Sequence, residues 1–323
     1  MEKHCSICGT SAKNRIVLAR SGKEILLWHC KQCCYDFQDH DPGKDLAANL
    51  LDESRLKSAG LDIPTVEIDF ENGLAQSRSY IKEYLEECDR NANILEIGCS
   101  WGYFLQLSRD FGSYPYGVEL NAIRAGYVNE RLCIPCDESL QHCELRGLKF
   151  RKIFMFYVLE YIYEPLSYVQ RLINMLEVGG TLIVITPNLN DAIKDLWQNS
   201  QFQKFFYDEH AINYMTVLTV ENLVARLSKE DVRIETRQGY SFLNHLNWFL
   251  NQSPRTTGVV GGDNLLSDVL VLLQPLDTSP EWSIQRRDLA FRLGELIQQF
   301  DIEYRRTLQD ALYGNQIRFQ VKR

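Results

Sequence analysis

Short apolar runs alternate with amphipathic runs between residues 93 and 240. The apolar runs include NILEIG, PYGVEL, KIFMFYVL and GGTLIVITP, and the segments between them include PLSYVQRLINML, which has the period of a helix. Strands that alternate with helices are typical of a parallel sheet with helices on both faces. Nearly all-apolar strands are typical of burial on both sides. The pattern therefore predicts an α/β fold with a doubly wound sheet over residues 93–240.

Two segments precede this core. Residues 1–45 hold four cysteines in two pairs and show little apolar periodicity. This segment therefore needs a cross-link, such as a bound metal ion, in order to fold. Residues 46–92 are predicted to form a helical linker. Its clearest helical stretch has apolar residues at Leu74, Ile81, Tyr84 and Leu85.

Residues 241–323 are predicted to form a C-terminal helical extension. Its long helix has a Ser-Pro start and a stop at Gly314. An apolar stripe runs along it, made of Leu289, Leu293, Leu296, Ile297, Phe300, Tyr304, Leu308 and Leu312. Core packing is the first interpretation of such a stripe, and a homodimer contact is the alternative.

Charge and composition narrow the class of protein. The formal net charge is −8, from 35 Lys and Arg against 43 Asp and Glu, so no global positive field attracts a nucleic acid. The N-terminus lacks the apolar run of a signal peptide, and no segment reaches the length of a membrane span. We therefore expect a soluble, cytoplasmic protein. In such a protein, the ten cysteines are expected to be thiols and metal ligands rather than disulfides.

A glycine-containing turn, EIGCSWG, follows the strand NILEI and precedes a helix. Gly98 and Gly102 allow a sharp turn and a close approach of the backbone to a ligand. Glu119 ends the next strand, where a carboxylate can accept the hydroxyls of a ribose. Ser100 replaces the middle glycine of a dinucleotide fingerprint, and no Walker lysine is present. These residues predict a nucleoside site; the alternative is a structural turn that binds nothing.

The turn resembles motif I of the class I S-adenosylmethionine (SAM)-dependent methyltransferases, which have a Rossmann-like fold. The stretch KIFMFYVLEYIYEPLSYVQRLINMLEVGGTLIVITPN resembles the later core of the same superfamily, so the resemblance covers about residues 76–240. Two positions depart from it: Arg151 and Lys152 replace the usual Phe-Asp, and Tyr161 replaces the usual His. The resemblance implies that SAM is the cofactor and that residues 46–92 also serve as a cofactor lid.

The resemblance also implies the residues of the cofactor site. The glycine turn would hold the methionine end of SAM, Glu119 the ribose, and Asp137 the adenine amino group. Arg78, in the helix before the turn, would pair with the cofactor carboxylate. The full set is Arg78, Glu96, Gly98, Cys99, Ser100, Gly102, Tyr103, Glu119, Leu120, Asp137, Glu138 and Tyr157.

Two Cys-x-x-Cys pairs predict a zinc site. Cys5 and Cys8 are separated from Cys30 and Cys33 by 21 residues, close to the spacing of a four-thiolate site. Four thiolates fill the tetrahedron of a zinc ion, so the metal is expected to be structural. Cys34, His4 and His29 are alternative ligands. A third pair, Cys133 and Cys136, lacks a fourth ligand and is not expected to bind metal.

A zinc module followed by this core resembles bacterial sugar C-methyltransferases and surface-polysaccharide methyltransferases. Glu209 and His210 match the Glu-His pair of those enzymes, which makes His210 the candidate general base and Glu209 its orienter or a second proton acceptor. Tyr214 lies four residues further and is a candidate for the same pocket. The sugar C-methyltransferases carry a larger C-terminal domain, so the acceptor atom stays open.

The sequence thus predicts a SAM-dependent methyltransferase that acts on O or C of a sugar or another small polyhydroxylated metabolite. Two alternatives remain. One is an RNA base methyltransferase, because some of these enzymes also carry N-terminal four-cysteine zinc modules. The other is a non-catalytic subunit that keeps the SAM fold as a scaffold.

Overall fold

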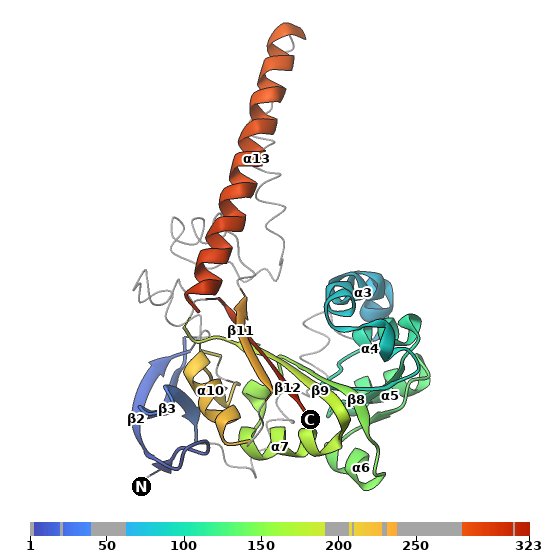
Figure 1. The fold of residues 1–323 in the computed structure, drawn as a ribbon, viewed down its shortest axis with the longest axis vertical. Helices are drawn as coiled ribbons and strands as arrows, with labels where there is room; N and C mark the ends of the chain where they lie inside the picture. Colours follow the sequence, from blue (N-terminus) through green and yellow to red (C-terminus); the bar gives the residue numbers. More distant parts are fainter. Residues whose placement is uncertain are drawn as a thin grey trace.

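The computed structural model describes residues 3–19, 22–39, 63–190, 207–208, 210–227, 231–237, 280–312 and 314–323. These residues form a central sheet with helices on both faces, a smaller N-terminal sheet beside it, and a long helix that projects from the body (Figure 1). The predicted doubly wound α/β core is therefore confirmed.

The central sheet has the strand order β11-β12-β9-β8-β5-β6-β7. The strands β9, β8, β5, β6 and β7 are parallel to one another, and β12 pairs antiparallel with both β9 and β11. The strands are β5 (Asn93–Ile97), β6 (Tyr114–Val118), β7 (Cys136–Asp137), β8 (Phe150–Phe156), β9 (Leu176–Pro187), β11 (Val232–Arg237) and β12 (Gln316–Lys322). The parallel strands end at one edge, where ligands of open α/β sheets bind.

Local signals in the sequence explain where several helices begin and end. The helices are α3 (Ile63–Tyr84), α4 (Tyr103–Phe111), α5 (Ala122–Glu130), α6 (Leu140–Leu145), α7 (Pro165–Met175) and α10 (Val217–Ala225). The Asn121 side chain accepts a hydrogen bond from the Arg124 N–H and caps α5, and a proline starts α7. Gly112 ends α4 in the left-handed conformation. The predicted helix before the core corresponds to α3.

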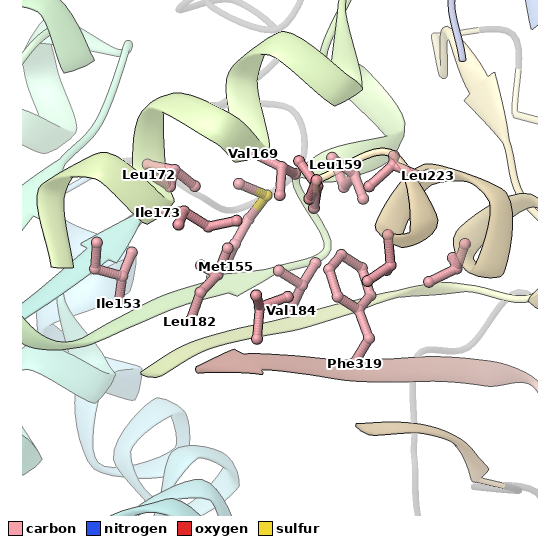
Figure 2. Close-up of a cluster of buried hydrophobic side chains, with 14 of the residues drawn as sticks. Ile153, Met155, Leu159, Val169, Leu172, Ile173, Leu182, Val184, Leu223 and Phe319 are labelled. Carbon is pink, nitrogen blue, oxygen red and sulfur yellow. The ribbon is translucent and has the colours of Figure 1, made fainter. Parts of the chain in front are cut away.

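Alternate residues of the central strands pack against helices on opposite faces. Ile153 and Met155 of β8 belong to the large core beneath α7 and α10, together with Phe319 of β12 (Figure 2). Phe154, between them in sequence, packs on the other face with Tyr84 at the end of α3. Period-two alternation in the apolar second half of β8 thus contributes to two cores, and both hold the carboxyl ends of the strands in place.

The N-terminal sheet has the order β1-β2-β3-β4-β10 and is antiparallel throughout. Its strands are β1 (Lys3–His4), β2 (Ser11–Leu18), β3 (Glu24–Cys30), β4 (Tyr35–Gln38) and β10 (Asn213–Tyr214). The last strand comes from the segment after β9, so it joins this sheet to the core. The two N-terminal Cys-x-x-Cys pairs lie within this unit.

The C-terminal part of the chain departs from the prediction in two ways. The predicted long helix is present as α13 (Pro280–Asp310), but residues after it form β12, a strand inside the central sheet rather than part of a helical extension. The stripe on α13 is also not simply core: Leu308 is buried, whereas Leu296 and Phe300 are 60% and 52% exposed. Among the described residues, no helix has the length and apolar character needed to cross a membrane.

Candidate functional site

The glycine turn lies between the end of β5 and the start of α4. Gly98 has φ +69°, and a Cβ at this position would lie 2.4 Å from Cγ2 of Val158, so no other residue fits without a shift. Gly102 has φ +80° and precedes the first residue of α4. Ser100 also has positive φ, at 51°. The turn therefore needs left-handed backbone conformations and a close approach to Val158, and Gly98 and Gly102 allow them.

Glu119 fixes this turn from the end of β6. Its Oε2 accepts a hydrogen bond from the Ser100 N–H at 2.9 Å, and its Oε1 accepts one from the Asn121 N–H at 2.9 Å. The side chain is only 8% exposed. Each carboxylate oxygen has a second lone pair, so Glu119 can still accept two hydroxyl groups while it holds the turn.

Glu96, on β5, has a carboxylate oxygen without a hydrogen-bond partner, on the strand that leads into the glycine turn. Its Oε2 is buried and has no hydrogen-bond partner. Burial, followed by the charges of Glu119 and Cys136, raises the pKa of Glu96 well above its usual value. A buried carboxyl without a partner is costly. It is the kind of group that a bound ligand can satisfy.

Asp137, at the end of β7, is already engaged. Its Oδ2 accepts the Tyr116 hydroxyl at 2.8 Å, and its Oδ1 pairs with Nη2 of Arg146 at 2.8 Å. Leu120, next to Glu119, is 59% exposed, and Glu138 is exposed as well. These three predicted residues lie at or just beyond the carboxyl ends of β6 and β7, on the same edge as the turn. Contacts of each with a cofactor stay predictions.

Four other predicted cofactor residues occupy varied surroundings. The Cys99 sulfur lies in a buried cluster, 3.7 Å from that of Cys136, so its contribution to a ligand would come from the backbone. Tyr103 packs against Phe70 of α3, with ring centroids 4.8 Å apart and the ring planes tilted by 48°. Arg78 forms an ion pair with Glu71 at 3.9 Å, and its side chain is 62% exposed. Tyr157, at the end of β8, is 38% exposed and has φ +56°.

Asp208 organises the segment that follows β9. Its Oδ1 accepts a hydrogen bond from the His210 N–H at 2.9 Å, and its carbonyl oxygen accepts one from the Tyr214 hydroxyl at 2.5 Å. The Tyr161 hydroxyl lies 3.4 Å from Oδ2 of the same residue. His210 is half-buried and Tyr214 is buried. Glu209 lies outside the described residues, so the Glu209–His210 pair stays a prediction.

The inner face of the N-terminal sheet meets this segment through a polar cluster. Asp36 is 1% exposed; one oxygen accepts from Nη2 of Arg15, and the other lies 2.7 Å from Nδ1 of His29. Arg15 also donates to the Tyr207 hydroxyl at 2.7 Å. Tyr207 packs against Tyr214, with ring centroids 5.2 Å apart. The sequence analysis missed this cluster, because its members become neighbours only across strands.

The four N-terminal cysteines converge. The sulfur atoms of Cys5, Cys8, Cys30 and Cys33 all lie within 4.8 Å of one another, and those of Cys8 and Cys30 are 3.5 Å apart. Zn–S bonds of about 2.3 Å put the sulfurs of a tetrahedral site about 3.8 Å apart, so the spacing fits zinc. His29 is turned to Asp36 instead. In the described part of the chain, no other group of His, Cys, Asp or Glu has this arrangement.

A cavity of about 330 Å³ lies at the opposite edge of the sheet from the glycine turn. Asn93, Tyr114 and Phe150 line it, at the amino ends of β5, β6 and β8. Ligands of open α/β sheets bind at the carboxyl ends of the strands. We therefore do not assign this cavity to the cofactor.

Comparison with known proteins identifies the core. Residues 71–227 match a family model described as a methyltransferase domain. Residues 71–227 are thus similar to a methyltransferase domain, which supports a SAM-dependent methyltransferase core. The glycine turn, the Glu119 carboxylate and the unsatisfied Glu96 all lie within the matched residues, and their chemistry fits SAM, which presents ribose hydroxyls and an ammonium group. No curated protein matches the chain.

Several solved structures resemble the fold of this methyltransferase at low identity. A SAM-dependent methyltransferase from Archaeoglobus fulgidus is 16% identical, with a TM-score of 0.46 over 81% of this chain and 100% of the other. The plantazolicin methyltransferase BpumL, solved with S-adenosylhomocysteine (SAH), is 13% identical, with a TM-score of 0.44 over 86% and 93%. A SAM-dependent methyltransferase from Thermotoga maritima, titled a possible histamine N-methyltransferase, is 13% identical, with a TM-score of 0.43 over 80% and 95%.

Proposed function

We propose that this methyltransferase transfers the methyl group of SAM to an oxygen or carbon atom of a small polyhydroxylated acceptor such as a sugar. The observation that carries the cofactor part is the Glu119 carboxylate, which holds the glycine turn and keeps lone pairs for a ribose. SAM supplies an activated methyl group on a sulfonium. The protein then has to align the acceptor and accept its proton.

The polar cluster on the N-terminal sheet supports a small hydrophilic acceptor. Buried Asp36 holds Arg15 and His29, whose side chains are 41% and 32% exposed. Donors fixed in this way lose little entropy when they bind a hydroxyl group. Tyr207 and Tyr214 connect the cluster to the segment that carries His210. An acceptor bound between the N-terminal sheet and this segment would meet both polar and aromatic groups.

His210 is the proposed general base for this reaction. Its backbone N–H is anchored on Asp208, in the segment that joins the carboxyl end of β9 to β10. The ring would take the acceptor proton as the methyl group is transferred. We propose that Glu209 orients this ring and that Tyr214 contributes to the same pocket.

We also propose that Cys5, Cys8, Cys30 and Cys33 bind one structural zinc ion. Four thiolates leave no open coordination position, so the ion would not activate water. Its role would be to hold the N-terminal sheet against the methyltransferase core.

The test is a transfer assay with SAM carrying a deuterated methyl group. The purified protein is incubated separately with the small-molecule fraction and with the RNA fraction of a cell extract, and products are detected by a three-deuterium mass shift. A labelled, polyhydroxylated product is expected, and the His210→Ala variant should form it at least about 10²-fold more slowly. Label that appears only in an RNA fraction would favour the RNA methyltransferase, and failure to bind SAM would favour the scaffold.

A further inference from the structure

Glu160 has a buried carboxyl group at the edge of the central sheet where the parallel strands end. It lies in the short 3-10 helix η2 (Leu159–Tyr161), directly after β8, and is 6% exposed. Its Oε2 lies 3.2 Å from the Thr186 hydroxyl, which donates to it. Thr186 is near the carboxyl end of β9 and is 1% exposed. The carboxyl group is thus fixed between the carboxyl ends of β8 and β9.

This position is close to the glycine turn. In the sheet, β8 lies between β9 and β5. Val158, two residues before Glu160, packs directly against Gly98 in the turn. Neighbouring strands are about 4.8 Å apart, so Glu160 lies roughly one or two strand spacings, about 5 to 10 Å, from the turn. A charge bound at the turn would therefore act on Glu160.

The groups that face Glu160 leave its charge uncompensated. No Lys or Arg of the described residues forms an ion pair with it. The Asp208 carboxylate faces it from the segment after β9, and the Tyr161 hydroxyl lies beside that carboxylate. Burial, helped by the Asp208 charge, raises the pKa of Glu160 to about 7. Hydrogen bonds from its own backbone and from Thr186 act in the opposite direction and lower this pKa. The group can therefore change its protonation near neutral pH.

We propose that Glu160 is the counter-charge of the cofactor sulfonium, ionised while SAM is bound and protonated once the sulfonium has become a thioether. This inference rests on the proposed SAM-dependent function. When the S–CH₃ bond breaks, its electron pair stays on sulfur and the positive charge is lost. The acceptor forms its new bond to the methyl group and gives one proton to the proposed base His210. His210 then releases that proton, and Glu160 takes one up. The site thus has the same net charge before and after transfer.

SAM and SAH provide a test that needs no acceptor, because they differ in the sulfonium charge. Their affinities are measured by calorimetry between pH 6 and pH 8, in buffers of different ionisation enthalpy. The sulfonium should lower the pKa of Glu160, whereas SAH should not. The SAM-to-SAH affinity ratio should therefore rise about fivefold over this range, for a pKa shift of about one unit. SAM binding should release protons that SAH binding does not.

Three variants identify the group responsible. Glu160→Gln should bind both ligands with a ratio that no longer depends on pH. Thr186→Val removes a hydrogen bond that lowers the pKa of Glu160, so the transition should move to higher pH. Asp208→Asn removes a charge that raises this pKa, so the transition should move to lower pH. The last two variants keep the test valid if Glu160→Gln does not fold.

The failures can be told apart. A ratio that is independent of pH in the wild type, or one that keeps its slope in Glu160→Gln, would overturn the role of Glu160 and leave the methyltransferase proposal intact. Transitions that do not move in opposite directions in the Thr186 and Asp208 variants would also overturn it. A wild-type protein that binds neither ligand would instead overturn the proposed function.

Discussion

Single side chains fix the chemistry at the edge of the sheet. Glu119 holds the Ser100 and Asn121 N–H groups, so one carboxylate fixes both the glycine turn and the start of α5. Asp208 acts similarly in the segment that carries His210. Glu119 is buried, so its removal would leave these donors unsatisfied, whereas Asp208 is exposed. The glycine turn and the segment that carries His210 are thus both held by hydrogen bonds to a carboxylate before any ligand binds.

The proposed base gives the first prediction at this scale. His210→Ala should keep its SAM affinity, because the cofactor contacts come from the turn and Glu119. The rate of methyl transfer should fall by about 10² to 10⁴, the usual contribution of general-base catalysis. Single-turnover transfer to the acceptor, with SAM binding measured in parallel, checks both parts. A variant with the parent rate would show that His210 is not the base.

The residues that could be predicted from sequence are those that a local pattern specifies. Gly98 and Glu119 follow from their places at strand ends, and the cysteine pairs follow from their spacing. Glu160 belongs to the stretch that resembles the later core of the superfamily, but its burial and its Thr186 partner depend on packing between strands. The Asp36 cluster likewise needs strand pairing that a single sequence does not specify.

At the scale of elements, the cysteine site and α10 are joined. The Thr219 hydroxyl, in the first turn of α10, lies 2.9 Å from the carbonyl oxygen of Cys33 and 3.0 Å from that of Cys34. At the other end of the helix, Arg226 donates to the carbonyl oxygen of Cys8 at 3.3 Å. Cys8 and Cys33 each belong to one of the two cysteine pairs, and Cys34 follows the second pair. Metal binding should therefore stabilise the contact between the N-terminal sheet and the core.

This contact predicts the effect of metal removal. Protein purified without added metal should contain about one zinc per chain, and Cys30→Ser should lose it and melt at a lower temperature. Cys88→Ser is the matched control, because Cys88 is exposed and outside the cluster. Metal analysis and thermal unfolding measure both effects. Full zinc occupancy in Cys30→Ser would contradict the ligand assignment.

The elements also show why the C-terminal prediction was incomplete. In β12, Ile317, Phe319 and Val321 are fully buried, and the residues between them alternate with them. This period-two pattern is present in the sequence, but its position after a long helix favoured a helical extension. Pairing of β12 with β9, more than a hundred residues earlier in the chain, is a long-range contact that local periodicity does not specify.

For the whole molecule, the unusual feature is α13. It projects from the body in Figure 1, and Leu296 is 60% exposed along its apolar stripe. Exposed apolar stripes on helices are commonly covered by a partner. We propose a second copy of the same chain as that partner, which retains the homodimer alternative of the sequence analysis.

The proposed dimer makes a direct prediction. Leu296→Glu should convert a dimer into a monomer, because it places a charge in an apolar contact. Gln299→Glu is the matched control: it adds the same charge at an exposed polar position of the same helix and should leave the dimer intact. Light scattering coupled to gel filtration gives the mass of each variant. A monomeric wild type would contradict the proposal.

The central claim is that the glycine turn and Glu119 bind SAM, and calorimetric titration of the zinc-containing protein with SAM tests it most directly. One SAM should bind per chain. Glu119→Ala should weaken binding by about 1 to 3 kcal/mol, because ribose hydroxyls and backbone N–H groups lose their acceptor. Glu130→Ala, at an exposed position, should bind as the wild type does. No binding to the wild type, or an unchanged dissociation constant in a folded Glu119→Ala variant, would contradict the claim.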